Sequence, residues 1–245
     1  SQILQQSMNK LSAEYEIDKI IWSEQKCAIS SFTMKLDQNY EGWAVSVPLK
    51  MPYSFLTLLC YTPQYLNGGA QQFIISTLNS LSLEYCNQKK SSGIFTEYAF
   101  PKEGQKQLCL EIAGEKINTY IDNVDISASQ FIVDLEFAVL SLYANHKLWK
   151  EAWQRYYRMI YRDCLPRIEQ VSIDIFNKLY PIAEKKDFEN ADIVFAQYIL
   201  SWVQTFEYQR EQTKNSSDFT PLPNVLCGEG NDCDSRSLLV ALLLK

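Results

Sequence analysis

The chain has 245 residues, of which 47% are hydrophobic and 21% are charged, a balance that is typical of folded globular proteins. Its net charge of −6 and its isoelectric point near 5.0 argue against nucleic acid or an anionic membrane as the main partner. No run of about 18 apolar residues occurs in the sequence, so we expect no transmembrane segment.

The first part of the chain, residues 1–124, is predicted to be a β-rich domain. It begins with a short polar helix over residues 1–15, after which β-forming residues alternate or cluster between Gly, Asn, Asp and Pro. We expect a mostly antiparallel sheet with one helix packed against it. The expected elements are strands at 28–36, 43–49 and 93–100, a hairpin turn at Lys102–Gln105 and a helix within Gln71–Tyr85.

After Asp125 the spacing of apolar residues becomes helical, and residues 125–186 are predicted to form a helical connector. Proline disfavours a helical conformation in the residue before it, so we expect interruptions at Leu165-Pro166 and Tyr180-Pro181. The regular apolar spacing of residues 191–206 predicts the clearest helix of the chain. Residues 187–245 are predicted to form a third part. For the chain as a whole we expect an α+β fold.

The cysteine and histidine content disfavours a metal site and a disulfide framework. Seven cysteines are scattered without a Cys-x-x-Cys pair, and His146 is the single histidine. We therefore expect no metal and no cofactor. His146 is interpreted as a partly exposed residue at a helix end. Cys60 and Cys109 lie within strand-like runs, where we expect buried thiols.

One cysteine differs from the others because it follows a glycine-rich turn and opens an apolar helix. Unpaired backbone N–H groups and the helix dipole at such a position favour the thiolate of Cys233, while Asp232 and Asp234 oppose it by like-charge repulsion. Asn231 or Asp232 can cap the helix. A purely structural cysteine is the plainer alternative. The predicted buried stripe of this helix is Leu238, Leu239, Leu242 and Leu243.

Four elements precede or surround this cysteine in order: the aromatic segment 202–208, the polar loop 211–220, the approach Pro221-Leu222-Pro223 and the turn 231–234. Together they resemble the first half of the core of the bacterial transglutaminase-like (papain-like) cysteine enzymes, over about residues 190–245.

The resemblance implies that Cys233 is the catalytic nucleophile. It also implies that Gly230, Asn231 and Asp232 support the turn and the oxyanion hole. The sequence departs from the family at Asn231, where a glycine is usual, and in having no histidine and no acidic or amide partner after the cysteine helix.

Two hypotheses of function follow. The first is a transglutaminase-like cysteine enzyme, a peptidase or an amide acyl transferase that forms a thioester at Cys233 with a protein or peptide substrate. Without the downstream histidine and acid, we expect the chain as given to be inactive. The second is a non-catalytic binding or scaffolding protein with a degenerate transglutaminase-like domain and a β-rich interaction domain. The sequence leaves open the oligomeric state and the location, either the cytoplasm or, if a leader or anchor was removed, the cell envelope.

Three further features of the sequence bear on other kinds of chemistry. Arg155, Arg158 and Arg162 share a helix face with aromatic residues, as in single-strand binders, but a solvated face or contacts with carboxylates suit an acidic chain better. The Gly228-Glu229-Gly230 turn lacks the lysine of a phosphate-binding loop. Cys227 could pair with Cys233, although the spacing alone does not decide this.

Overall fold

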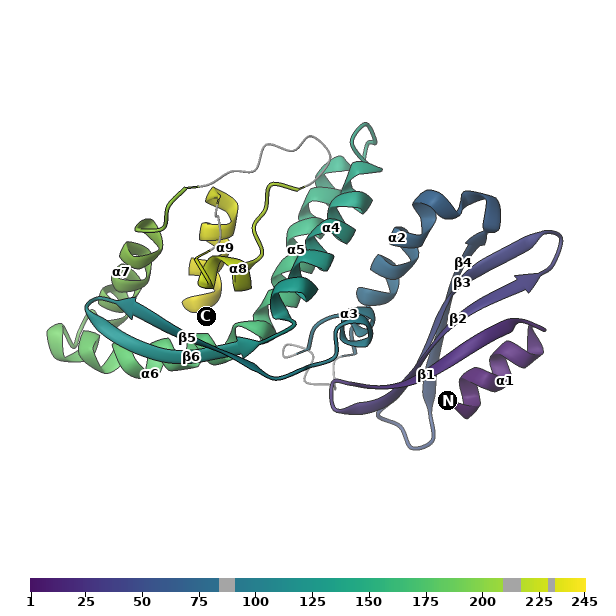
Figure 1. The fold of residues 1–245 in the computed structure, drawn as a ribbon, viewed down its shortest axis with the longest axis horizontal. Helices are drawn as coiled ribbons and strands as arrows, with labels where there is room; N and C mark the ends of the chain where they lie inside the picture. The colour runs from purple at the N-terminus through teal and green to yellow at the C-terminus, as the bar shows by residue number, and fades with distance from the viewer. Residues whose placement is uncertain (84–90, 209–216, 229–231) are drawn as a thin grey trace. The chain divides into compact units, whose positions relative to one another are not determined.

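A computed structural model of the chain describes residues 1–83, 91–208, 217–228 and 232–245 (Figure 1). The fold is α+β, as predicted: a four-stranded antiparallel sheet comes first and is followed by helices and a two-stranded hairpin. The strands are β1 Glu14–Trp22, β2 Gln25–Lys35, β3 Asn39–Pro48, β4 Phe55–Pro63, β5 Gln105–Ile112 and β6 Glu115–Asp122. The described helices are α1 Gln2–Lys10, α2 Asn67–Asn79, α3 Ile94–Ala99, α4 Asp125–Ser141, α5 Trp149–Arg167, α6 Glu169–Lys186, α7 Ala191–Gln204, α8 Leu222–Leu226 and α9 Cys233–Leu243, with a short 3₁₀ turn at Gln64–Leu66.

The chain divides into two compact units. The first unit contains Ser1–Ala99 and Ala138–Met159, and the second contains Phe100–Phe137 and Ile160–Lys245. The division at residues 124 and 186 that the sequence suggests stays a prediction. None of the helices in the described part of the chain is both long and apolar enough to cross a membrane.

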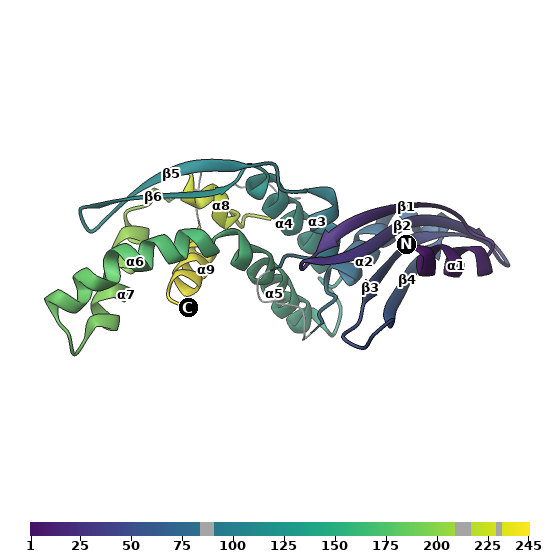
Figure 2. The ribbon, with the colours of Figure 1, turned by 90° about the horizontal axis from the view of Figure 1, so that it is seen from below.

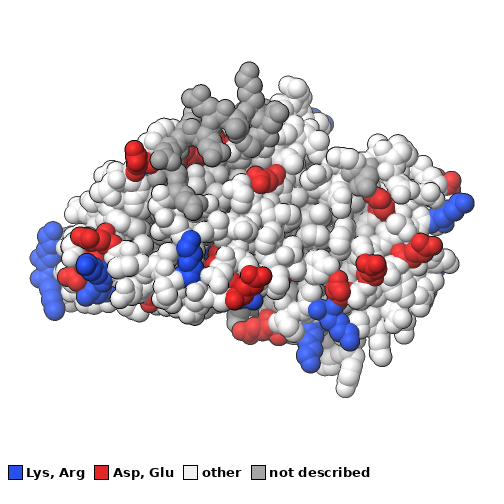
Figure 3. Space-filling model, in the orientation of Figure 1, with Lys and Arg blue, Asp and Glu red and all other residues white. Residues whose placement is uncertain are grey.

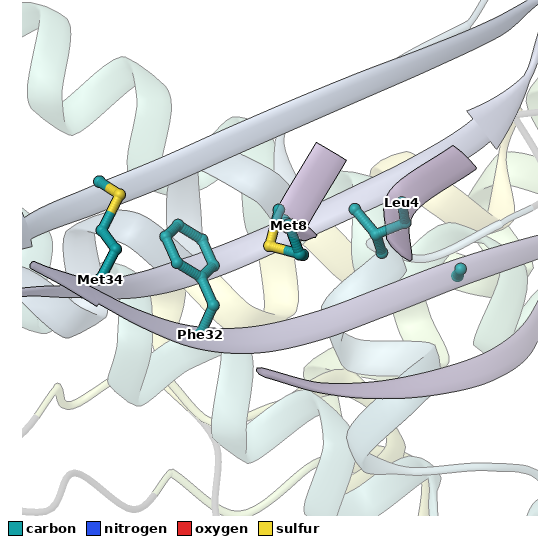
Figure 4. Close-up of a cluster of buried hydrophobic side chains, with 6 residues drawn as sticks. Leu4, Met8, Phe32 and Met34 are labelled. Carbon is teal, nitrogen blue, oxygen red and sulfur yellow. The ribbon is translucent and has the colours of Figure 1, made fainter. Parts of the chain in front are cut away.

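In the first unit, α1 packs on one face of the sheet in the order β1-β2-β3-β4. Leu4 and Met8 lie one helical turn apart, are fully buried, and point toward Phe32 and Met34 of β2 (Figure 4). The helix expected to be polar is therefore amphipathic. Along β2, side chains that face α1 alternate with side chains that point to the other side of the sheet. The sheet therefore has a second face, opposite α1.

The second face of the sheet is covered by α2 and α3. The register places Glu16, Ser31 and Trp43 side by side across β1, β2 and β3 on this face. Trp43 contacts Phe95 of α3 edge-on, with ring centroids 4.9 Å apart. The predicted helix within Gln71–Tyr85 corresponds to α2, which begins and ends earlier than expected.

The strand predicted at 93–100 is wrong, because this segment contains helix α3. The buried side chain of Asn79, at the end of α2, accepts hydrogen bonds from the backbone N–H groups of Phe95 (2.8 Å) and Thr96 (3.2 Å). These N–H groups lie in the first turn of α3, where no intrahelical acceptor exists. A residue of the neighbouring helix therefore caps α3 and outweighs the β propensity of its Ile, Phe, Thr and Tyr residues.

In the second unit, β5 and β6 form a hairpin whose buried face packs on α6 (Figures 1 and 2). Because Ile112 pairs with Glu115, the turn of the hairpin is Ala113-Gly114. Both turn residues have positive φ, as type I′ hairpin turns require. The turn expected at Lys102–Gln105 is wrong, because residues 102–104 lie between α3 and the start of β5 at Gln105. The buried apolar residues of the hairpin are Leu110, Ile112, Ile117 and Ile121.

The helix predictions of the second half are mostly correct. Helix α7 matches residues 191–206 closely, and the helical run before Leu165-Pro166 ends nearby, where α5 stops at Arg167. The stop predicted at Tyr180-Pro181 is wrong, since α6 continues through Pro181 to Lys186. Burial of Leu179 and Ala183 on either side of the proline favours continuation of the helix over the cost of the lost hydrogen bond.

A buried ionic network joins α4 to the end of α5. The Arg167 guanidinium donates to both carboxylate oxygens of Asp163 at 2.8 and 2.9 Å and to Asp125 Oδ1 at 2.8 Å. Ser129 Oγ donates to Asp163, and the Asp122 N–H donates to Asp125 Oδ2. The side chains of Arg167, Asp125 and Asp163 are 8%, 7% and 3% exposed.

Candidate active site

The approach to the candidate nucleophile is helix α8, which is almost entirely buried. Pro221 precedes the helix, and its carbonyl accepts the N–H groups of Asn224 (3.0 Å) and Val225 (3.2 Å). Gly228 follows the helix with a φ of +83°, a left-handed conformation that favours glycine after a helix end. The proline-bearing approach expected from the sequence is therefore a short buried helix that ends in a glycine turn.

Cys233 is the first residue of α9, and Asp232 caps this helix. The Asp232 Oδ1 atom accepts the backbone N–H of Ser235 at 2.7 Å, and the Asp232 side chain is buried. Of the two capping residues that the sequence allows, Asp232 is thus the one used. Asn231 and Gly230, the other predicted residues of the turn, lie outside the described residues.

Two further residues of the first turn of α9 hold the helix in place. Ser235 is fully buried, and its Oγ accepts the backbone N–H of Thr220 at 2.9 Å. The Arg236 guanidinium donates to the Phe206 carbonyl at 2.6 Å, beyond the end of α7, and lies over the ring of Tyr208. Neither role was inferred from the sequence, where the Asp-Cys-Asp-Ser-Arg run gives no sign of these contacts.

The buried face of α9 packs against α7 and α8, which lie beside it in Figure 1. Leu239, Leu242 and Leu243 are buried as predicted, and Leu238 is half-buried. Cys233 lies on the opposite, exposed side. Among the described residues, the Cys233 N–H donates to no acceptor, and its carbonyl accepts the Ser237 hydroxyl at 2.8 Å. The thiol is therefore presented to solvent at the N-terminus of an anchored helix.

The remaining predicted features do not join this site. His146 is exposed between α4 and α5, with its Nδ1 accepting the Leu148 N–H and its ring edge-on to Tyr143. Cys227 and Cys233 are both free thiols. No group of three or more His, Cys, Asp or Glu residues within the described ranges is arranged to hold a metal ion.

Two of the three arginines of the α5 strip are engaged inside the protein, whereas Arg158 is exposed. Arg155 donates to the Ser76 carbonyl at 3.1 Å. Burial lowers the pKa of Arg162, and the neighbouring Asp163 opposes this effect. These two arginines make internal contacts, in keeping with the plainer of the two interpretations of the strip.

The other cysteines provide a contrast in environment. Burial raises the pKa of Cys60, which is half-buried, whereas Cys109 is exposed and the expectation of a buried thiol there is wrong. Cys164 of α5 is fully buried, and it accepts the backbone N–H of Leu222 at the start of α8. Burial, followed by the charge of Asp163, raises the pKa of Cys164 to about 12.

The raised pKa of Cys164 predicts that the protein loses stability at alkaline pH. The unfolded thiol loses its proton near pH 9.0 and the folded thiol near 12, so the stabilisation is complete below pH 9 and declines between these values. At pH 10.5 the loss attributable to this residue is about 2 kcal/mol. Urea unfolding of the native protein and of Cys164→Ala at pH 8 and 10.5 measures it. Equal losses in both proteins would show that the thiol ionises as easily in the folded state as in the unfolded state.

Comparisons of the chain with protein-family models, with curated proteins and with solved structures find no match. The chemistry open to this site follows from its own geometry. That geometry offers an exposed thiol, a backbone N–H beside it and the positive end of a helix dipole, all on one rigid element.

Proposed function

We propose that residues 187–245 form the nucleophile-bearing part of a transglutaminase-like cysteine enzyme domain and that Cys233 is its nucleophile. The observation that carries the proposal is the position of this thiol: it is exposed at the first residue of α9, and the capping carboxylate beside it is buried. A helix N-terminus stabilises a thiolate, which is the form of cysteine that attacks carbonyl carbon.

The order of the elements also supports the proposal. A long apolar helix, α7, is followed by a segment that includes the polar loop, by the proline-bearing approach at α8 and by the cysteine helix α9. The contacts of Ser235 with Thr220 and of Arg236 with Phe206 fix α9 to the two segments that precede it. Such anchoring positions a nucleophile more accurately than a loop would.

The reaction that suits this site is acyl transfer from a peptide or glutamine amide. The Cys233 thiolate adds to the amide carbonyl, the carbon–nitrogen bond breaks, the amine leaves with a proton, and an acyl-thioester remains on Sγ. Water or a second amine then releases the acyl group and restores the thiol. In this proposal the Cys233 N–H, which has no acceptor among the described residues, donates to the oxyanion formed in each step. Protonation of the leaving amine requires an acid, a role that the resemblance assigns to a histidine after the cysteine helix.

Selective alkylation tests the assignment of the nucleophile. Iodoacetamide at pH 7 is expected to modify Cys233 about tenfold faster than Cys109, because only the first thiol lies at a helix N-terminus. Cys109 is the matched control, since it is exposed on strand β5 of the same unit. The rates are measured by mass spectrometry of the peptides, and a Cys233→Ser variant identifies the labelled site.

A second comparison separates a reactive thiol from an accessible one. Phenylmercuric acetate binds thiols with little dependence on their ionisation near neutral pH, so Cys233 and Cys109 should react with it at similar rates. If iodoacetamide also modifies both cysteines equally, Cys233 is an ordinary surface thiol. That result would favour the alternative hypothesis of a binding or scaffolding protein with a degenerate transglutaminase-like domain.

A further inference from the structure

The first unit contains a cavity that the proposed cysteine chemistry does not use. Its volume is about 550 Å³, which is within the range of small-molecule sites. It lies on the sheet face that α2 and α3 cover, and its walls come from β1, β2, β3 and α2. All of these elements belong to the same unit, so the cavity is a property of that unit alone.

The lining of this cavity is acidic. The carboxylates of Glu14, Glu16 and Glu41 contribute to it, and none of the described residues that line it is basic. Within the described part of the chain, these three carboxylates form no hydrogen bond or ion pair. Figure 3 shows several acidic side chains over the N-terminal sheet, on the right in that view, with basic side chains next to them. Three neighbouring negative charges without internal partners leave the cavity ready to accept positive charge.

The spacing of the carboxylates disfavours a single metal ion. The Cα atoms of Glu14 and Glu16 are about 7 Å apart on one strand, and the Cα atom of Glu41, two strands away, lies about 10 Å from that of Glu14. Carboxylate oxygens bind Ca²⁺ or Mg²⁺ at about 2.0–2.6 Å and have to converge on the ion. The three groups instead suit a ligand that carries several positive charges at different points.

An aromatic wall adds a second kind of recognition. The indole of Trp43 lines the cavity and is held by edge-on contacts with Phe95 and Tyr98, at centroid distances of 4.9 and 6.1 Å. Indole is the ring that binds ammonium groups most strongly through its face. The hydroxyls of Ser31 and Thr33 supply oxygen acceptors between the carboxylates.

The negative potential extends to the next residue on this face of β1. The Tyr98 hydroxyl donates to Asp18 Oδ2 at 2.7 Å. This hydrogen bond, followed by burial and by the charges of Asp18 and Glu16, raises the pKa of Tyr98. The charges of Glu16 and Asp18 are therefore felt by a group beside the cavity.

We propose that this cavity binds a linear polyamine, whose ammonium groups pair with Glu14, Glu16 and Glu41 and one of which also contacts the indole of Trp43. The polyamine class is favoured over a basic protein partner because the cavity is the size of a small molecule and is enclosed on one side by α2, through Gln71 and Ile74. The inference is independent of the function proposed for Cys233.

Titration calorimetry with spermidine tests the proposal. The native protein is expected to bind one spermidine, and Glu16→Gln/Glu41→Gln is expected to weaken binding about tenfold. The control is Glu103→Gln/Glu111→Gln, which changes the net charge equally, from −6 to −4, at exposed positions of the other unit. This control should bind within about twofold of the native protein. Circular dichroism verifies that both variants are folded, and the single variant Glu41→Gln should show an intermediate loss.

Four results would overturn the proposal. Equal weakening in both double variants would indicate a general effect of net charge, and displacement of spermidine by Mg²⁺ at equal concentration would indicate simple counterion binding. Tighter binding of a trilysine peptide than of spermidine would favour a protein partner. A Trp43→Leu variant that binds normally would remove the role of the indole and count against the assigned site.

Discussion

Replacing Arg167 with methionine is expected to lower the free energy of unfolding by about 3–5 kcal/mol. The substitution keeps an unbranched side chain of similar length but leaves the carboxylates of Asp125 and Asp163 buried without their cation. An unpaired buried charge is among the costliest changes in a folded protein. Urea unfolding at pH 7, followed by circular dichroism, measures the effect.

The electrostatics of the network explain why the loss is large. Burial raises the pKa of Asp125, and the charge of Arg167 and its hydrogen bond oppose that rise. Burial alone would lower the pKa of Arg167, but its attraction to Asp163 and Asp125 raises that pKa on balance. Each charge is thus maintained by its neighbours, and removing the shared cation affects both acids.

Two other variants make the test specific. Lys178→Met breaks an exposed ion pair with Glu115 in the same unit and should cost about 0.5 kcal/mol or less. Combining Arg167→Met with Asp125→Asn and Asp163→Asn removes all three charges and should recover part of the loss. A cost below about 1 kcal/mol for Arg167→Met alone would contradict the expectation that this buried network is essential for stability.

Replacing Asn79 with alanine is expected to cost about 3 kcal/mol, the second largest effect. The change leaves the N–H groups of Phe95 and Thr96 without their acceptor and removes the donor to Thr96 Oγ1 at 2.8 Å. Each buried donor that loses its partner costs about 1–3 kcal/mol. Urea unfolding measures the total, and the tryptophan fluorescence of the folded protein should change as well, because Trp43, one of five tryptophans, packs on Phe95.

The matched control is Asn190→Ala, which removes an exposed amide that donates to Asp187. This variant should lose about 0.5 kcal/mol or less. Similar losses for Asn79→Ala and Asn190→Ala would mean that α3 does not depend on its cap. Gly93 lies close to the Asn79 side chain, and a Cβ atom at this position would lie 2.3 Å from Asn79 Oδ1. Replacing Gly93 with alanine is therefore a second way to disturb the cap.

The elements that could be predicted from the sequence are those whose signal is local. Helix α7 repeats apolar residues at helical spacing, and β2 and β3 combine β-forming residues with nearby turns, so each was placed correctly. Helix α3 was missed because its cap, Asn79, comes from 16 residues away. The continuation of α6 past Pro181 depends on the burial of Leu179 and Ala183, which a proline rule does not include.

The same distinction between local signals and contacts of distant segments applies to the candidate active site and to the cavity of the first unit. The cap formed by Asp232 follows from its place before an apolar helix, and it was one of two residues expected. The anchoring contacts of Ser235 and Arg236 join segments that are 15 and 30 residues apart, and nothing in the local sequence indicates them. The acidic cavity depends on the register of three strands, since Glu14, Thr33 and Glu41 become neighbours only through that register.

The carboxylates of β1 have a consequence for self-association. β1 is an outer strand of its sheet, and outer strands with exposed backbone groups can pair with the same strand of another molecule. Glu14, Glu16 and Asp18 occupy alternate positions along β1, so an antiparallel pairing of two copies would bring like charges together. The acidic row therefore also protects the sheet against growth into an intermolecular aggregate.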